Sequence, residues 1–279
     1  MNAVEHTLTL LQTVPRIDPD LDPLLVNDEA LPAMSGLPTF ELFAQPIYAT
    51  RPGNRHHWVE LLIRGTAHWS QLPVDRLVDV AYRNCGVDFD LAVVREGCRI
   101  ARRWTGCTRL SVNIHPRSLH QPRFVSTLAN WAERHPGIAR RLVLELVEFQ
   151  GAVDLSHCHN ALVQLHRSGY RLALDDFGPG APNFDVLSTG LIGTVKLDRS
   201  LVRHLECKPA SERLIAGLVA FASRLGVDLV AEGIETRAQF ERLSALGIEW
   251  FQGYLLGRPR PVQQYPTPPF TPTQKEQQS

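Results

Sequence analysis

Apolar runs with the length of strands alternate with amphipathic helical patterns through most of the sequence, and this alternation limits the fold more than any other feature. The first two runs, residues 40–48 and 58–64, flank a Pro-Gly-Asn turn at residues 52–54, which predicts an antiparallel hairpin. Residues 73–103 then carry two helical patterns, after which strand and helix patterns follow in turn. The predicted later strands are residues 109–114, 142–146, 171–174, 193–198, 228–232 and 250–252, and the predicted later helices are residues 123–135, 155–168, 185–187, 210–225 and 237–246.

Eight strands with intervening helices predict an α/β fold, a closed (β/α)8 TIM-like barrel with an antiparallel first strand. The barrel domain is expected to span residues 37–262. Residues 1–36 are rich in proline and poor in pattern, which predicts a flexible N-terminal arm. Residues 263–279 are rich in proline and glutamine, which predicts a disordered tail.

Composition excludes several classes of protein. Lysine plus arginine and aspartate plus glutamate both number 29, so no overall field favours a nucleic acid polymer or a membrane surface. The five cysteines have no C-x-x-C spacing, which argues against a zinc site and against a disulfide framework. Neither a secretory leader nor a run long enough to cross a bilayer is visible, so we expect a cytoplasmic protein.

Two adjacent carboxylates, Asp175 and Asp176, end the apolar run of residues 172–174. Neighbouring anions at the mouth of a buried strand repel each other and resist loss of water, so they persist where cations or hydrogen bonds compensate them. A pair of divalent ions is one explanation. The alternative is that the two residues open a turn or cap the next helix, as aspartate often does.

The barrel interpretation requires the chemically active residues to lie at the carboxyl ends of the strands. A polar residue is embedded in or ends seven of the apolar runs: Glu60, Asn113, Glu145, Asp175 with Asp176, Lys196, Glu232 and Gln252. Most of these side chains offer oxygen atoms, which suit a hard divalent cation such as Mg²⁺ or Mn²⁺. Each residue alone has a structural explanation, but their coincidence on seven strands favours a site.

From about residue 40 to residue 259 the chain resembles the EAL domain family of cyclic-di-GMP phosphodiesterases. The motifs that carry the resemblance are Gln45-Pro46-Ile47, Ser111-Val112-Asn113, Glu145-Leu146-Val147-Glu148, Asp175-Asp176-Phe177-Gly178, Lys196-Leu197-Asp198, Ala231-Glu232-Gly233-Ile234-Glu235-Thr236 and Gln252-Gly253-Tyr254-Leu255-Leu256-Gly257-Arg258-Pro259. Each motif alone is weak, whereas their combination and order are specific.

The resemblance implies a role for each matching position. One metal ion would be held by Glu60, Asn113, Glu145 and Asp175, and a second by Asp175, Asp176 and Glu232. Lys196 would orient the attacking water, and Glu232 would also accept a proton. The implied substrate contacts are Gln45, Arg64, Asp198, Glu235 and Gln252. Glu148 would anchor the loop that follows the paired aspartates.

Several positions depart from the family pattern. Leu61 stands where the family has a small residue, and we expect this larger side chain to crowd the substrate pocket. Val147 replaces a threonine, and prolines at 179 and 182 stiffen the following loop. His115 replaces a serine, and Tyr82 stands where a glutamate is expected. None of these changes removes a metal ligand.

Two functions from different classes remain open. The first is a phosphodiesterase that uses two Mg²⁺ or Mn²⁺ ions to hydrolyse cyclic-di-GMP to linear pGpG by in-line attack. The second is a weak or inactive EAL module that acts as a cyclic-di-GMP receptor or as a protein-interaction regulator. Because the complete carboxylate set is present, we favour the enzyme. The implied partners are cyclic-di-GMP, a second copy of the chain in a homodimer, and a regulatory protein.

Overall fold

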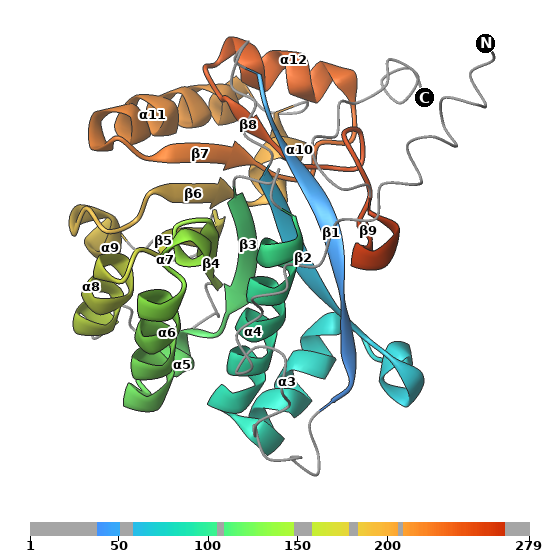
Figure 1. The fold of residues 1–279 in the computed structure, drawn as a ribbon. Coiled ribbons are helices and arrows are strands. Elements are labelled where there is room, and N and C mark those ends of the chain that lie inside the picture. Colours follow the sequence, from blue (N-terminus) through green and yellow to red (C-terminus); the bar gives the residue numbers. More distant parts are fainter. Residues whose placement is uncertain are drawn as a thin grey trace, which may run out of the picture. The chain divides into compact units, whose positions relative to one another are not determined.

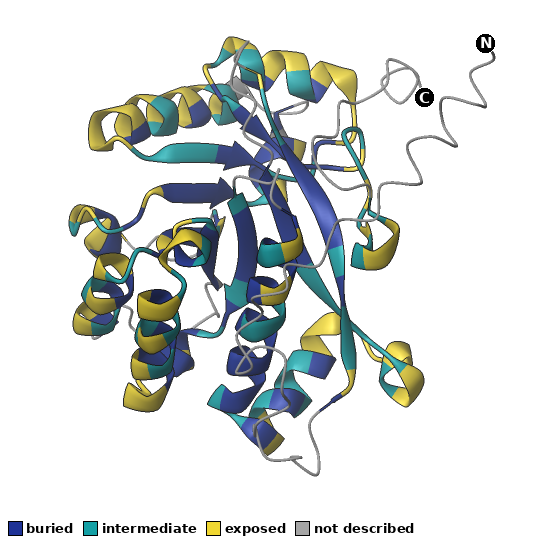
Figure 2. Ribbon diagram, in the orientation of Figure 1, coloured by how far each residue is buried: buried dark blue, intermediate teal, exposed yellow. Residues whose placement is uncertain are grey.

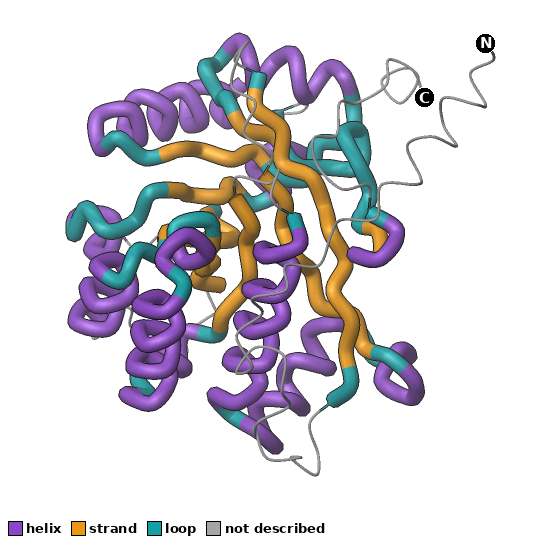
Figure 3. Tube along the Cα trace, in the orientation of Figure 1, coloured by secondary structure: helices purple, strands orange, loops and turns teal. Residues whose placement is uncertain are grey.

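The computed structural model of the chain describes residues 38–50, 58–104, 109–147, 158–178, 184–205 and 209–265. Within these residues, eight strands close into a barrel surrounded by helices (Figure 1; Figure 3). The strands are β1 (Phe40–Ala49), β2 (Trp58–Gly65), β3 (Arg109–Ile114), β4 (Leu142–Val147), β5 (Arg171–Phe177), β6 (Thr194–Leu197), β7 (Asp228–Ala231) and β8 (Trp250–Phe251). The predicted fold class is confirmed.

The direction of β1 distinguishes it from the other barrel strands. It pairs antiparallel with β2 and also antiparallel with β8, while the pairs from β2–β3 through β7–β8 are all parallel. The predicted antiparallel start is therefore present, although its turn at residues 52–54 lies outside the described residues. Because β2 to β8 run in one direction, their carboxyl ends meet at one rim of the barrel.

The helices cover the outside of the strands and bury one face each, which Figure 2 shows as dark inner and yellow outer surfaces. They are α3 (Val74–Cys85), α4 (Val87–Arg103), α5 (Pro116–Leu119), α6 (Pro122–Arg134), α7 (Pro136–Ala139), α8 (His159–Arg167), α9 (Phe184–Ser188), α10 (Arg199–His204), α11 (Pro209–Leu225) and α12 (Arg237–Ala245), with 3-10 turns at Ala67–Gln71 and Val262–Gln264. No helix in the described part of the chain has the length and apolar character needed to cross a bilayer.

Some elements differ from the sequence-based expectations. The short helices α5, α7 and α10 were not predicted, because four to six residues carry no readable helical period. A two-residue strand, β9 (Arg260–Pro261), pairs with β1 and was hidden by its proline. Strand β5 continues to Phe177, whereas the prediction ended it before the two aspartates, which have low strand propensity.

The predicted segment boundaries fall partly outside the described residues. The predicted arm, residues 1–36, lies outside them entirely, as do residues 266–279 of the predicted tail. The helix predicted at 155–168 is described from residue 158, and α8 covers its C-terminal part. Before residue 266 the chain still packs, because the Tyr265 ring stacks on Trp104 with centroids 5.3 Å apart.

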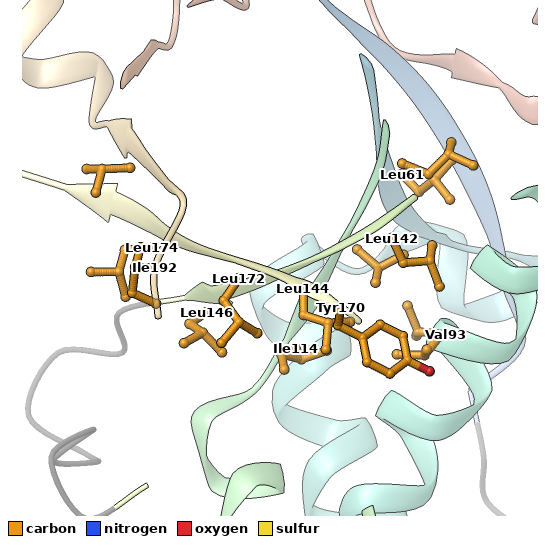
Figure 4. Packing of buried hydrophobic residues seen from close by; sticks show 14 of the residues in the cluster. Leu61, Val93, Ile114, Leu142, Leu144, Leu146, Tyr170, Leu172, Leu174 and Ile192 are labelled. Carbon is orange, nitrogen blue, oxygen red and sulfur yellow. The ribbon is translucent and has the colours of Figure 1, made fainter. Parts of the chain in front are cut away.

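Two hydrophobic clusters divide the core. The larger lies between the outer face of the strands and the helices, and Figure 4 shows part of it, including Leu61, Leu144 and Val93. The smaller contains Ile47, Trp58, Val143, Ala173, Val230 and Trp250, near the amino ends of the parallel strands. Because side chains alternate across a strand, the residues two positions beyond this smaller cluster also face the barrel interior.

Candidate active site

Strand alternation brings the predicted site residues together inside the barrel at the carboxyl ends of its strands. Glu60 lies two residues after Trp58, Glu145 two after Val143, and Asp175 two after Ala173, so all three continue the inward-facing rows of the smaller cluster. Asn113, Lys196, Glu232 and Gln252 come from β3, β6 and the ends of β7 and β8. The structure thus gathers residues far apart in sequence, with 192 positions between Glu60 and Gln252.

Lys196 lies at the centre of this group. Its side chain is 1% exposed, and its Nζ atom lies 2.7 Å from Glu232 Oε1 and 2.8 Å from Glu145 Oε2. The same Nζ lies 3.1 Å from Glu60 Oε2 and 3.2 Å from Asp175 Oδ1. One ammonium group therefore contacts four carboxylates from four strands or strand ends, an arrangement that sequence spacing could not indicate.

Amides hold Glu60 in place from two sides. Asn113 Nδ2 donates to Glu60 Oε1 at 2.9 Å, and Gln252 Nε2 donates to Glu60 Oε2 at 2.6 Å. Gln252 Nε2 also donates to Gln45 Oε1 at 3.2 Å, and Gln45 Nε2 donates to the Gly257 carbonyl at 3.0 Å. This network links β1, β2, β3 and the end of β8, and it fixes the orientation of the Glu60 carboxylate.

Burial and charge crowding perturb the acids strongly. Burial raises the pKa of Asp175 to about 6 and the pKa of Glu232 to about 8, against the opposing pull of Lys196. Burial also raises the pKa of Glu145 well above its ordinary value. In Glu60 burial acts in the same direction, but Lys196 and the two amide donors outweigh it and lower its pKa.

Lys196 stays positively charged in this environment. Burial alone would lower its pKa, but the surrounding carboxylates outweigh that effect and raise the pKa well above the usual value for lysine. A single ammonium group faces five carboxylates when Asp176 is included, which leaves an excess of four negative charges in their fully ionised form. Such an excess is what two divalent cations would neutralise.

The donor atoms fit a pair of hard metal ions. Carboxylate oxygens of Glu60, Glu145 and Asp175 lie within 4.8 Å of one another, and so do those of Asp175, Asp176 and Glu232. Asp175 belongs to both groups. Asn113 Oδ1 and Glu145 Oε1 are buried and have no hydrogen-bond partner among the described residues, so each is available as a ligand. An all-oxygen set suits Mg²⁺ or Mn²⁺.

The backbone is strained at Asp176. Its φ of +55° lies in the left-handed region, which is unfavourable for residues other than glycine. The pairing of β5 with β6 shifts register between Leu174 and Phe177, and the Asp176 N–H donates to Asp175 Oδ1 at 3.0 Å. This irregularity allows two consecutive aspartates to serve one site, because a regular strand would turn them to opposite faces.

A cavity of about 270 Å³ opens over the carboxylates. Eight predicted site residues line it: Gln45, Glu60, Asp175, Asp176, Lys196, Glu232, Glu235 and Gln252. Five other lining residues were not predicted as site residues: Leu62, Arg199, Gly233, Gly253 and Tyr254. Arg199 and Tyr254 could have been found from their positions in the sequence, since each lies within two residues of a predicted site residue. At Gly253 an added Cβ would lie 2.2 Å from the Ile234 backbone, so only glycine fits there.

Other predicted site residues lie away from the described wall of this cavity. Asn113 and Glu145 do not line the cavity, but they contact residues that do: Asn113 hydrogen-bonds to Glu60, and Glu145 hydrogen-bonds to Lys196. Arg64 donates to the Ile63 carbonyl at 2.7 Å and lies over the Phe43 ring. Asp198 Oδ1 accepts from the Ser200 N–H at 2.9 Å and caps α10. Glu148 lies outside the described residues.

The expected effect of Leu61 on the pocket is wrong. Leu61 is 1% exposed and belongs to the larger core cluster between the strands and the helices (Figure 4). It neighbours Glu60 in a strand, so its side chain leaves on the opposite face and does not line the cavity. Two other departures from the family pattern contact each other, because the rings of Tyr82 and His115 have centroids 4.2 Å apart.

The comparisons with known proteins agree with this geometry. The family model described as "EAL domain" matches residues 28–259. The chain is 28% identical over 229 residues to the Escherichia coli protein named "Probable cyclic di-GMP phosphodiesterase PdeA", covering 79% of this chain and 30% of that protein. The chain thus spans less than a third of the length of the first curated relatives that it matches.

Solved structures extend the likeness. The "PaMucR Phosphodiesterase, c-di-GMP complex" superposes with a TM-score of 0.70 at 29% identity, covering 81% of this chain and 98% of that one. The manganese and cyclic-di-GMP complex of Klebsiella pneumoniae BlrP1 superposes with a TM-score of 0.68 at 26% identity, covering 82% of this chain and 57% of that one. Both likenesses include the barrel that carries the candidate active site.

Proposed function

The chain belongs to the EAL domain family, and we propose that it hydrolyses cyclic-di-GMP to linear pGpG in the cavity of the candidate active site. The observation that carries the proposal is the complete set of convergent oxygen ligands, two of which are buried and lack a partner among the described residues. Relatives named as phosphodiesterases, and the cyclic-di-GMP complex of PaMucR, support the choice of substrate.

We propose two divalent ions, Mg²⁺ or Mn²⁺, as the cofactors. Glu60, Asn113, Glu145 and Asp175 would hold one ion, and Asp175, Asp176 and Glu232 would hold the other. When bound, such ions lower the pKa of a water molecule and neutralise charge on phosphate oxygens. The manganese and calcium complexes of Klebsiella pneumoniae BlrP1 support a divalent ion in this fold.

The positive charge of Lys196 makes it a hydrogen-bond donor and not a base. Because its pKa is raised well above the usual value, it donates hydrogen bonds and does not accept a proton at neutral pH. It would hold the carboxylates in register and orient the attacking water. Glu232, 2.7 Å from Lys196, is the group to which we assign acceptance of a proton from that water.

Substrate binding would use the polar wall of the cavity. Gln45, Glu235 and Gln252 line it and offer amide and carboxylate groups suited to the edges of guanine. Arg199 lines the same wall and supplies the planar, charged fork that recognises phosphate. Arg64 and Asp198 remain proposed substrate contacts.

The homodimer remains a proposal as well. Exposed apolar side chains gather on α9 and α11, where Phe184 is 47% exposed, Phe221 39% and Leu225 44%. The Phe184 and Phe221 rings contact each other with centroids 5.7 Å apart. Sedimentation of the parent and of Phe221→Ser tests the proposal: self-association that the substitution leaves unchanged argues against this surface.

Product analysis tests the enzyme. Purified, metal-stripped protein is incubated with cyclic-di-GMP and Mg²⁺, Mn²⁺ or Ca²⁺, and the nucleotides are resolved by chromatography. We expect pGpG with Mg²⁺ or Mn²⁺, none in excess chelator, and little with Ca²⁺, whose irregular coordination does not hold tight in-line geometry. Glu60→Gln is the matched variant, because it removes one charge with almost no change of shape.

Two outcomes would overturn the proposal. Full turnover in excess chelator would exclude the metal-dependent mechanism. A parent protein that binds cyclic-di-GMP tightly in the presence of Mg²⁺ and Mn²⁺ without producing pGpG would instead establish the receptor function.

A further inference from the structure

Asp90 on α4 is a buried acid that the proposed mechanism does not use. It is 3% exposed, and its Oδ2 atom accepts hydrogen bonds from the His115 N–H at 2.9 Å and the Ser118 hydroxyl at 2.7 Å. Tyr82 on α3 also hydrogen-bonds to Asp90, and its hydroxyl lies 3.1 Å from Ser118 Oγ. The carboxylate therefore joins two helices to the turn that follows β3.

That turn directly follows a site residue. Asn113 is the second-last residue of β3, His115 comes two residues later, and α5 begins at Pro116. His115 follows Ile114, the last residue of the strand, and its Nδ1 accepts from the Arg117 N–H at 3.1 Å, which caps α5. The backbone direction just after Asn113 is thus set by Asp90 on one side and by the cap on the other.

Asn113 needs an accurate orientation. Its Nδ2 donates to Glu60 Oε1 at 2.9 Å, which leaves Oδ1 buried and without a hydrogen-bond partner among the described residues. A rotation of the strand end would break the Glu60 contact or turn Oδ1 away from the carboxylates. We propose that Asp90 is a positioning residue, which holds the end of β3 so that Asn113 Oδ1 is presented to the metal ion.

The cost of burying Asp90 supports this role. Burial raises its pKa to about 6, although three hydrogen bonds stabilise the charged form. A buried acid of this kind is expensive for folding, and an apolar residue would fill the same space without the cost of burying a charge. When a residue that orients a metal ligand without binding the metal itself is removed, metal affinity typically falls by about 10- to 100-fold.

The test is calorimetric titration of metal-stripped protein with Mn²⁺, together with thermal unfolding. Asp90→Ala should weaken Mn²⁺ binding by about 10- to 100-fold, because the His115 N–H and the strand end lose their anchor. Asp90→Asn retains an acceptor oxygen and should recover most of the affinity. If Asp90→Ala lacks a cooperative unfolding transition, Asp90→Leu replaces it, since leucine keeps the volume and still offers no acceptor.

Asp88 provides the matched control. It lies in the same turn of α4, is 9% exposed and pairs with Arg123 at 2.7 Å, and within the described residues no hydrogen bond or ion pair joins it to the β3 turn. Asp88→Ala should lower thermal stability and leave Mn²⁺ affinity within about twofold of the parent, a change of about 0.4 kcal/mol on the scale where tenfold is 1.4 kcal/mol.

The proposal rests on the proposed function, and the titration separates the two. A parent that binds no Mn²⁺ would reject the metal centre and the role of Asp90 together. A parent that binds Mn²⁺ while folded Asp90→Ala or Asp90→Leu binds it equally well would reject only the role of Asp90. An equal loss of affinity in Asp88→Ala would also reject it, since the effect would then follow general destabilisation of α4.

Discussion

Both ends of the barrel enclose a cation, and the surroundings of the two cations differ. At the carboxyl ends of the strands, Lys196 Nζ contacts four carboxylates, and burial, together with the neighbouring carboxylates, raises the pKa of three of them, Glu145, Asp175 and Glu232. At the amino ends, the Arg109 guanidinium lies over both the Trp58 and the Trp250 rings, 5.0 Å and 5.1 Å from their centroids. Arg109 also pairs with Asp228 at 2.8 Å.

The difference separates function from stability within one barrel. At the amino-terminal end, the indole N–H has a partner, since Trp58 Nε1 donates to Ser111 Oγ at 2.5 Å, and the two indole rings pack edge to face. The carboxyl-terminal end keeps an excess of negative charge and three buried oxygens without a partner among the described residues, Asn113 Oδ1, Glu145 Oε1 and Gln252 Oε1, which a protein retains where ligands compensate them. Substitutions at the two ends should therefore affect different measurements.

Trp58→Ala should show the largest effect and should act on stability. The side chain is 1% exposed, packs edge to face against Trp250 and covers one side of Arg109, so its removal leaves a large cavity and a less covered cation. We expect a loss of about 3–5 kcal/mol in the free energy of unfolding, measured by urea denaturation. Turnover per folded molecule should stay near that of the parent. A collapse of turnover at temperatures where the variant is folded would contradict the separation.

Asp175→Asn should show the opposite behaviour. Removing the charge shared by both ligand groups should lower turnover by about 100- to 1,000-fold, the scale for losing one charge-stabilising group. The free energy of unfolding should not fall. Burial raises the pKa of Asp175 to about 6, so its charged form is unfavourable in the folded protein, and Lys196 still pairs with three other carboxylates after the substitution. The rate of pGpG formation and the thermal transition check both expectations. Parental turnover in this variant would contradict the proposed catalytic site.

The parts of this comparison differ in how far the sequence could predict them. Local hydrophobic patterns in the sequence predict the alternation of strands and helices, so the barrel and the residues that end its strands were predictable. The rest depends on contacts between distant strands: only the register of the closed sheet brings Lys196 to its four partners and places Arg109 over the Trp58 and Trp250 rings. No local pattern encodes that register.

Two further misses had different causes. The direction of Leu61 was available from the sequence, because a neighbour of inward-facing Glu60 in a strand must face outward. The left-handed backbone of Asp176 was not, because it occurs where the pairing of β5 with β6 shifts register, and no local pattern in the sequence marks that shift. The strained residue lies at the site, where local rules are most often broken.

Leu61→Ala sharpens the comparison within a single strand. Leu61 packs in the outer core near Gly97, so its removal should lower the free energy of unfolding by about 2–3 kcal/mol. The expected loss lies in the lower part of the usual range for a leucine-to-alanine change, because Gly97 has no side chain that could lose contact with Leu61. Turnover should stay near that of the parent, in contrast to Glu60→Gln one residue earlier. Increased turnover with unchanged stability would show that Leu61 crowds the pocket after all.

Asp228→Asn makes the same chemical change as Asp175→Asn at the opposite end of the barrel, and it should have the smallest effect. The Asp228 side chain is 37% exposed, so water screens its pairing with Arg109, and the indole rings still hold the guanidinium after the charge is lost. We expect a loss of about 0.2–1 kcal/mol in the free energy of unfolding, the range for exposed ion pairs. The loss should shrink as salt is raised, because salt screens exposed charges. Turnover should equal that of the parent at every salt concentration. Urea denaturation at low and high salt, run beside the pGpG assay, measures both quantities. A large, salt-independent loss would show that the amino-terminal end also depends on compensated charge, and the contrast between the two ends would then be one of ligand binding alone.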